Sequence, residues 1–365
     1  MEDNKKLTIT FVVPSLNLTG GIRVISIYAS YLADSGHNVY VVSPSRKIHP
    51  IKKRIKSLIT GHGWSAGSHF SDAYFTNPNV KLKILDSWRD VTTNDVPDAD
   101  VVIATFWNTA EWVNLFPESK GKKLYFIQHH EVHPWMPIDR VKQTLKMPFK
   151  KLVVAEWLKN IMASEYDDFD VKVIPNGVDH SQFYSGQREK NQIPTVGFFY
   201  SEREFKGTDT ILEAINFARK SCPNIQVIAM GMKAPIKKYP LPNNTKYIQA
   251  PPQEDIRRIY ESCDVWLFGS RSEGFGLTLL ESMSCKTPVI ATRAGAAEEL
   301  VGRSKGILVD IDDYRSMASA IIEIANMAQS DWLKLSNLAY TTSLDYTWGN
   351  SAEMFEKELQ KIAFS

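Results

Sequence analysis

Apolar and polar positions along the chain follow a period that switches between strand-like and helix-like. The first apolar run, Leu7 to Val13, has the length of a buried strand. From about Ile22 to Ser35 the apolar residues recur as on one face of a helix, and Val39 to Ser43 is a second strand-like run. Such a strand–helix–strand unit typically begins a doubly wound parallel sheet, which binds its ligand at the carboxyl ends of the strands.

The same pattern continues to the end of the chain and predicts two α/β domains. Further strand-like runs cover residues 101–106, 123–128, 151–155, 171–174, 195–200, 225–231, 245–250, 265–270, 288–292 and 306–310. Pro175 and Gly177 fix a turn, and the polar tract Ser185 to Gln192 has the composition of a linker. We therefore expect Rossmann-like domains over residues 1–184 and 185–344, followed by a helix within residues 345–365.

Composition narrows the class of protein. With 365 residues, 43% of them hydrophobic, the chain is long enough for two full cores, and its net charge of +2 argues against a nucleic-acid partner. Cys222, Cys263 and Cys285 show no Cys-x-x-Cys spacing, which fits a reducing compartment and no structural metal. The N-terminus is too polar for a signal peptide, and no apolar run approaches the ~20 residues of a membrane helix, so we expect a cytoplasmic location.

The stretch from Asp264 to Glu281 joins an apolar run, a polar turn and a helical pattern. A helix beginning near Gly276 would direct the N–H groups of its first turn at an anion, and Gly274 permits close approach of the backbone. Glu273 in the turn and Glu281 in the helix would lie on the order of 10 Å apart. Because a carboxylate can accept two hydrogen bonds from a vicinal diol, this arrangement can hold a sugar, a diphosphate and a ribose in that order.

The motif E-x7-E within E-G-F-G-L-x-x-L-E closely resembles the donor-site signature of the retaining glycosyltransferases of family 4. In that family the first Glu contacts the transferred sugar and the second contacts the ribose, which implies these roles for Glu273 and Glu281. The family usually has Pro, Ala and Gly where this chain has Thr278, Ser282 and Lys286. A surface helix with two solvated Glu residues is the alternative. The resemblance further implies that the donor contacts Gly274, Phe275, Gly276, Leu277 and Thr278.

Glycines and cations mark two other loops. Gly20-Gly21 follows the first strand without the G-x-G-x-x-G spacing, so a nicotinamide site is not expected; family 4 has a similar glycine pair close to the phosphates and the acceptor. Arg203 and Lys206 follow the strand-like run 195–200, where cations are well placed to neutralise a diphosphate. Lys206-Gly207 matches the family pattern better than Arg203, for which a solvated loop position is a credible alternative.

Histidines follow the run 123–128 directly. Three His and Glu131 in H-H-E-V-H-P suggest zinc, but the helical H-E-x-x-H motif needs one more residue between Glu131 and the second His, and Pro134 disfavours a helix. In family 4 a His or similar polar group at this point borders the donor sugar and the acceptor. Either His129 or His130 is therefore the candidate, with ordinary loop histidines as the alternative. Gln128-x-x-Glu131 faintly resembles a subset of the family that includes some rhamnosyltransferases.

Three Asp-x-Asp tripeptides could hold Mg²⁺ or Mn²⁺ on a diphosphate. Two of them precede strand-like runs, at the end away from the expected ligand, and the third stands where a helix N-cap belongs. We therefore predict no metal site. The tripeptides are Asp98-Ala-Asp100, Asp168-Phe-Asp170 and Asp310-Ile-Asp312.

A basic segment near residue 50 permits two interpretations. Its cations alternate with apolar residues at a spacing compatible with an amphipathic helix on an anionic membrane, which would place the protein on the inner face of the plasma membrane. A solvated helical face explains the same pattern. The cations concerned are Lys52, Lys53, Arg54 and Lys56.

The resemblance covers most of the chain and implies the GT-B fold, two Rossmann-like domains facing a cleft, with the last helix crossing back onto the first domain. It implies a retaining, metal-independent glycosyltransferase without a cofactor, which transfers a sugar from a nucleotide-sugar donor to a glycan or lipid-linked acceptor. Carboxylates at glycosidase spacing are not evident, so hydrolysis is not favoured. The alternatives are a nucleotide-sugar epimerase of the same fold and a non-catalytic sugar-nucleotide-binding subunit.

Overall fold

The computed structural model describes residues 5–16, 19–46 and 74–365. The four basic positions Lys52, Lys53, Arg54 and Lys56 lie outside these residues, so the predicted membrane contact stays a prediction. Within the described residues, none of the helices combines the length and the apolar character that a membrane span requires.

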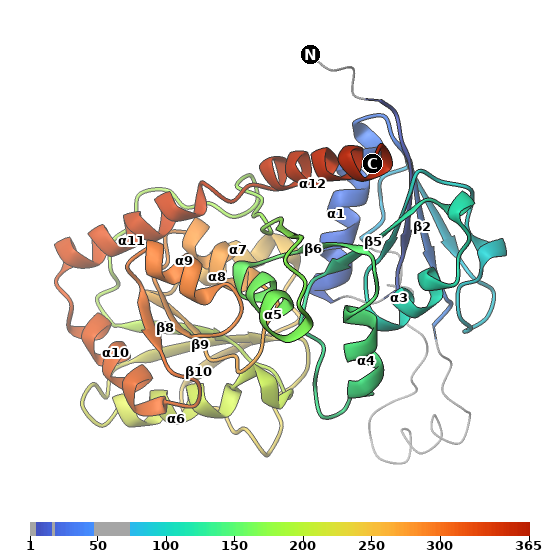
Figure 1. Cartoon of the computed structure of the whole chain (residues 1–365). Helices are drawn as coiled ribbons and strands as arrows, with labels where there is room; N and C mark the ends of the chain where they lie inside the picture. The colour runs from blue at the N-terminus through green and yellow to red at the C-terminus, as the bar shows by residue number, and fades with distance from the viewer. Residues whose placement is uncertain (1–4, 17–18, 47–73) are drawn as a thin grey trace. The chain divides into compact units, whose positions relative to one another are not determined.

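The chain forms two compact units, one of Met1–Ile174 with Ser351–Ser365 and one of Pro175–Asn350. Each unit is built on its own parallel sheet with helices on both faces, which confirms the predicted α/β class with two Rossmann-like units (Figure 1). Strands covered on both faces are expected to be apolar throughout. All four residues of Val101–Ala104 and of Val289–Thr292 are buried accordingly.

The sheet of the first unit has the strand order β3-β2-β1-β4-β5-β6-β7. The sequence patterns did not predict β3, which forms one edge of this sheet. The elements are β1 (Thr8–Val12), α1 (Gly20–Asp34), β2 (Asn38–Ser43), β3 (Val80–Ile84), β4 (Val101–Ala104), α3 (Trp107–Asn114), β5 (Lys122–Ile127), α4 (Ile138–Leu145), β6 (Lys150–Val153), α5 (Glu156–Tyr166) and β7 (Val171–Val173).

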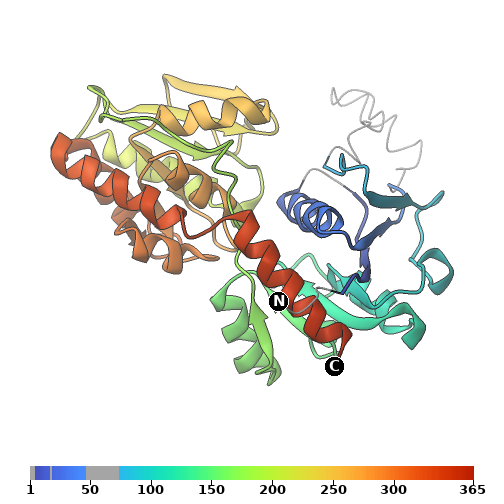
Figure 2. The ribbon, with the colours of Figure 1, turned by 90° about the horizontal axis from the view of Figure 1, so that it is seen from above.

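The last helix, α12 (Trp348–Ala363), packs on the first unit from Ser351 onward. Its Phe355 stacks on Tyr28 of α1 with ring centroids 4.5 Å apart and meets Phe126 of β5 edge-on at 5.2 Å. Gln360 Nε2 donates to the carbonyl of Lys5 at 2.8 Å, so the helix ends beside the first strand of the sheet (Figure 2). The core of the first unit is therefore completed by the end of the chain.

The sheet of the second unit has the order β10-β9-β8-β11-β12-β13, and all its neighbouring strands are parallel. Strand order reverses between β8 and β11, and in open α/β sheets ligands bind outside the carboxyl ends of strands at such a switch point. The elements are β8 (Thr195–Phe199), η3 (Glu204–Lys206), α6 (Thr208–Ala218), β9 (Gln226–Gly231), β10 (Thr245–Gln249), α7 (Gln253–Glu261), β11 (Val265–Phe268), α8 (Leu277–Ser284), β12 (Val289–Thr292), α9 (Ala297–Arg303), β13 (Ile307–Val309), α10 (Tyr314–Asn326) and α11 (Gln329–Ser343).

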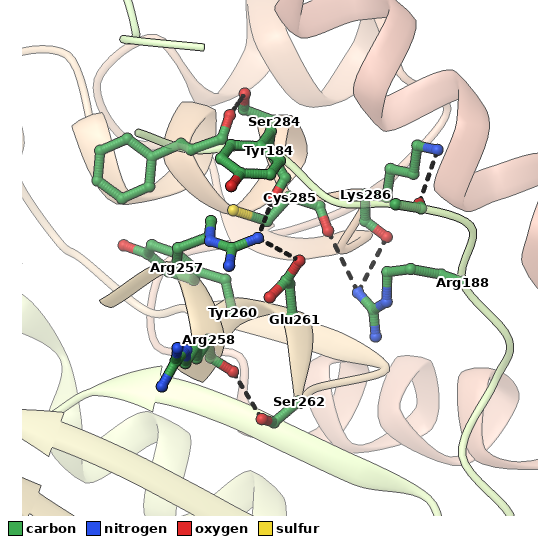
Figure 3. Close-up of polar contacts among 12 residues, drawn as sticks. Tyr184, Arg188, Arg257, Arg258, Tyr260, Glu261, Ser262, Ser284, Cys285 and Lys286 are labelled. Carbon is green, nitrogen blue, oxygen red and sulfur yellow. Dashed lines mark hydrogen bonds and ion pairs between the residues drawn. The ribbon is translucent and has the colours of Figure 1, made fainter. Parts of the chain in front are cut away.

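Residues 185–192, expected to be a linker, are anchored to the second unit by Arg188. This side chain is buried, and its guanidinium donates to the carbonyl of Cys263 (2.8 Å) and to Thr287 Oγ1 (2.7 Å). It also donates to the carbonyl of Lys286 at 3.2 Å (Figure 3). Cys263 and Lys286 lie just beyond the carboxyl ends of α7 and α8. Because helix carboxyl ends favour a cation, Arg188 ties both helices together at these ends.

Replacing Arg188 by Ala should lower the free energy of unfolding by about 3 kcal/mol, because several buried acceptors lose a charged donor. Urea or thermal denaturation measures this. Arg258→Ala is the matched control, since Arg258 is exposed on α7 (Figure 3), and it should change stability little. Equal stability of the two variants would contradict the anchoring role of Arg188.

Candidate functional site

The loop after β8 lies directly against the end of β11. Gly207 has φ of +61°, and a Cβ built on it would be 1.8 Å from the carbonyl oxygen of Gly269. Only glycine fits there, because both the backbone angle and the close approach exclude a side chain. The contact places η3, which ends at Lys206, beside the turn that follows β11.

Lys206 and Glu273 meet at this contact. Lys206 Nζ is 2.5 Å from Glu273 Oε2, and Ser270 Oγ donates to the same oxygen at 3.2 Å. Both charged side chains are partly shielded, with 27% and 18% of their surface exposed. The structure thus brings together two of the residues selected from the sequence, at the switch point of the second sheet.

Helix α8 begins at Leu277, one residue after Gly276, which has φ of +102° and no side chain to cap the helix. The turn before it is braced by the loop after β12, since Ala296 N donates to the carbonyl of Phe275 at 2.9 Å. Gly274, Phe275 and Gly276 are buried, whereas Leu277 and Thr278 are half-buried. The amino end of α8 therefore follows directly on the turn that carries Glu273.

Glu281 lies within α8 and is buried. Tyr260, from the end of α7, donates its hydroxyl to Glu281 Oε2 at 2.9 Å. The tyrosine ring meets the indole of Trp266 edge-on at 4.6 Å, which fixes the position of the hydroxyl. Glu281 is therefore not a solvated surface residue, contrary to the alternative interpretation of the motif.

Sequence reasoning missed Arg271, which lies two residues before Glu273. Its Nε donates to Asp312 Oδ1 (2.7 Å) and its Nη2 donates to Asp209 Oδ2 (2.8 Å). Although burial raises it, the hydrogen bond from Arg271 brings the pKa of Asp209 below its usual value. The one signal in the sequence that could have drawn attention to Arg271 is its place in the same turn as Glu273.

Arg203 is placed less favourably than Lys206. It is exposed, and its guanidinium carbon lies 5.9 Å from the ring centroid of Phe205. The backbone carbonyl of Arg203 accepts the N–H of Lys206 at 2.9 Å. Arg203 therefore stabilises, through its backbone, the turn that carries Lys206.

In the first unit, Gly20 and Gly21 form the first turn of α1. Gln128, directly after β5, donates from Nε2 to the carbonyl of Gly21 at 3.2 Å. A Cβ on Gly21 would be 3.6 Å from the side chain of Gln128, an ordinary contact distance. Gly20 and Gly21 therefore begin the helix that follows β1 and lie next to Gln128, which directly precedes His129 and His130.

His129 and His130 have different surroundings. The Nδ1 of His129 is 3.0 Å from the carbonyl of His130, so it must donate, and the ring lies near His133 at 4.9 Å. His130 Nε2 is hydrogen-bonded to Tyr166 OH at 2.9 Å. Burial lowers the pKa of His130, which favours its neutral form.

Glu131 is a second residue whose importance sequence reasoning did not establish. Its Oε2 accepts the backbone N–H of Trp107 at 3.2 Å, at the start of α3. Burial raises the pKa of Glu131 well above its usual value, and the hydrogen bond from Trp107 only partly offsets this. A titratable group shifted in this way, at the carboxyl end of a strand, is a candidate for function.

The Asp-x-Asp tripeptides take structural roles, with one correction to the expected cap. Asp313, not Asp310 or Asp312, caps α10, since its side chain accepts from Ser316 N at 2.9 Å. Asp312 has φ of +64° and pairs with Arg271 instead. Among the described residues no group of three or more His, Cys, Asp or Glu is arranged to hold a metal ion.

Comparison with known proteins finds a match for the second unit. A family model described as glycosyl transferases group 1 matches residues 181–336, which cover most of this unit. The D-inositol 3-phosphate glycosyltransferase of Corynebacterium jeikeium is 26% identical over 220 residues, 53% of this chain and 52% of that protein. An uncharacterized glycosyltransferase of Methanocaldococcus jannaschii is 28% identical over 182 residues, 48% of this chain and 50% of that protein. The chain thus spans about half the length of these curated relatives.

Solved structures match over nearly the whole chain. Sucrose-phosphate synthase of Thermosynechococcus elongatus covers 99% of this chain and 100% of its own, with a TM-score of 0.75 at 17% identity. The Anabaena protein HepE, solved in complex with UDP and glucose, covers 97% of this chain and 100% of its own, with a TM-score of 0.71 at 16% identity. These matches show the fold: the two units have the GT-B fold of glycosyltransferases.

Substituting Gly207 by Ala should destabilise the second unit by about 2–4 kcal/mol, because a left-handed backbone angle and a backbone collision are both imposed. Thermal melting measures this loss. Gly186→Ala is the control, since a Cβ there meets nothing within 4 Å and its melting temperature should hardly change. A Gly207 variant as stable as this control would show that the loop can move away from β11.

Proposed function

We propose that the protein is a retaining, metal-independent glycosyltransferase of family 4. It moves a sugar from a nucleotide-sugar donor to a hydroxyl of a glycan or lipid-linked acceptor, in polysaccharide or glycoconjugate synthesis in the cytoplasm. The observation that carries the proposal is the pairing of Lys206 with Glu273 at the switch point of the second sheet. The glycosyl transferases group 1 match over residues 181–336 and the solved complex of HepE with UDP-glucose support it.

In this proposal Lys206 binds the diphosphate of the donor. A diphosphate carries more negative charge than one carboxylate, so it competes with Glu273 for the ammonium group. The amino end of α8 supplies further positive potential beside it. Both stabilise the charge that develops on the departing diphosphate, which is electrostatic work that a metal ion does in other enzymes.

The two glutamates hold the parts of the donor on either side of the diphosphate. Once Lys206 turns to the diphosphate, Glu273 can accept hydrogen bonds from hydroxyls of the sugar. Glu281, whose carboxylate accepts the hydroxyl of Tyr260, also accepts hydrogen bonds from the ribose diol in this proposal. Its burial strengthens these hydrogen bonds relative to water.

The acceptor side of the proposal rests on the first unit. His129 and His130 follow β5 directly and both make hydrogen bonds within the first unit, and either can contact the sugar or the acceptor hydroxyl. Gly20 and Gly21 begin α1, and family 4 has a similar glycine pair close to the phosphates and the acceptor. Retention of the anomeric configuration requires that the acceptor attack from the side that the diphosphate leaves.

Lys206→Ala should reduce kcat by about 100-fold, because it removes a charge that stabilises the leaving group. Glu281→Gln should instead raise the donor KM by about tenfold with a smaller effect on kcat. Turnover is followed by NMR with UDP-, GDP- and ADP-sugars, which also reports the anomeric configuration. Lys233→Ala is the control, since this exposed lysine pairs with Glu202. Wild-type turnover in both site variants, or epimerised donor without transfer, would contradict the proposal.

Chelation should leave the activity unchanged, because cations of the chain itself neutralise the diphosphate. The measurement is donor turnover before and after dialysis against EDTA. An activity that EDTA abolishes and Mg²⁺ restores would show that the reaction depends on a metal.

A further inference from the structure

The geometry points to Arg271 as the positioning residue that fixes Lys206 for the donor diphosphate. This inference rests on the proposed function, because it concerns the same site. The three residues of η3 form a single turn, and one such turn has little stability by itself.

Arg271 grips the two residues that precede Lys206 through their backbone carbonyls. Its Nη1 donates to the carbonyl of Glu204, which also accepts the N–H of Gly207 at 3.1 Å. The backbone N–H of Arg271 donates to the carbonyl of Phe205 at 2.8 Å. Two consecutive peptide groups are therefore held by one residue, which sets the direction in which Lys206 leaves the turn.

Arg271 is itself held rigidly from the opposite side. Asp209, in the first turn of α6, and Asp312, after β13, bind its Nη2 and Nε at 2.8 and 2.7 Å. Thr210 Oγ1 donates to the same oxygen of Asp312 at 3.1 Å, which closes the network. A guanidinium fork held by two carboxylates has little freedom, so its remaining donor is pre-oriented toward Glu204.

The charge balance distinguishes the roles of the two cations. Arg271 is neutralised by two carboxylates, whereas Lys206 pairs with Glu273, which is proposed to accept hydrogen bonds from the sugar once Lys206 turns to the diphosphate. A diphosphate therefore gains more from Lys206 than from Arg271. Arg271 acts on the donor only through the position of Lys206.

A double-mutant cycle on nucleoside diphosphate binding tests this inference. UDP, GDP and ADP are first screened by calorimetry against the wild-type protein, and the tightest binder is used. Lys206→Ala should weaken its binding by about tenfold and Arg271→Gln by about threefold to tenfold. In the Lys206→Ala background, Arg271→Gln should weaken nucleoside diphosphate binding by less than about a further twofold, because Lys206 is no longer there to be positioned. Arg293→Gln, which removes an arginine with two exposed carboxylate partners, is the control and should bind as the wild type does.

The same factor from Arg271→Gln with and without Lys206 would overturn the inference, as would the absence of any effect. Hydrogen exchange of residues 203–207 gives a second readout that needs no ligand. Exchange should be faster in Arg271→Gln than in the wild type and in Arg293→Gln, and equal exchange would also overturn the inference. A wild-type protein that binds none of the three nucleotides would contradict the proposed function, and exchange would then still decide whether Arg271 holds the turn.

Discussion

The arrangement of charged groups in the second unit depends on the contact between Gly207 and Gly269. A Cβ on either glycine would lie within 3 Å of the carbonyl oxygen of the other, so backbone meets backbone without an intervening side chain. Lys206 and Glu273 follow β8 and β11, which pair in register, and are 67 positions apart in sequence. The close contact of the two glycines brings the loops after these strands near enough for Lys206 and Glu273 to form a short ion pair.

Much of this could be predicted from the sequence because it depends on local signals. Apolar runs identified the central strands of both sheets, and glycines with positive φ at Gly207 and Gly276 mark the two turns of the site. The edge strand β3 was missed although its residues, Val80-Lys-Leu-Lys-Ile84, alternate strictly between apolar and polar. Such alternation indicates a half-buried strand, so the local signal was present but extended over only five residues.

What the sequence did not reveal are side chains whose partners come from distant segments. Because Arg188 stands in a polar tract, composition alone assigned it to a linker. In the structure its side chain is buried against carbonyls near residues 263 and 286. Arg271 acquires its role from Asp209 and Asp312, which lie on different elements. The capping position was displaced from the Asp-x-Asp tripeptide to Asp313 for the same reason. Asp312 is already engaged by a tertiary ion pair, which no local pattern encodes.

The surroundings of Asp209, near Lys206, favour a charged side chain, whereas the surroundings of His130 and Glu131, after β5, favour neutral ones. In the proposed glycosyl transfer, this difference fits a charged donor and an uncharged acceptor. In the second unit the hydrogen bond with Arg271 keeps Asp209 ionised, so the charges around Lys206 stay fixed. In the first unit burial raises the pKa of Glu131 and lowers that of His130, which favours the neutral form of each. A diphosphate needs fixed charges that are already in place, because reorganising them would cost free energy in the transition state. A hydroxyl acceptor is uncharged, and a neutral side chain can form a hydrogen bond with it without the cost of desolvating a charge. The same desolvation that would weaken a diphosphate site is therefore suited to an acceptor site.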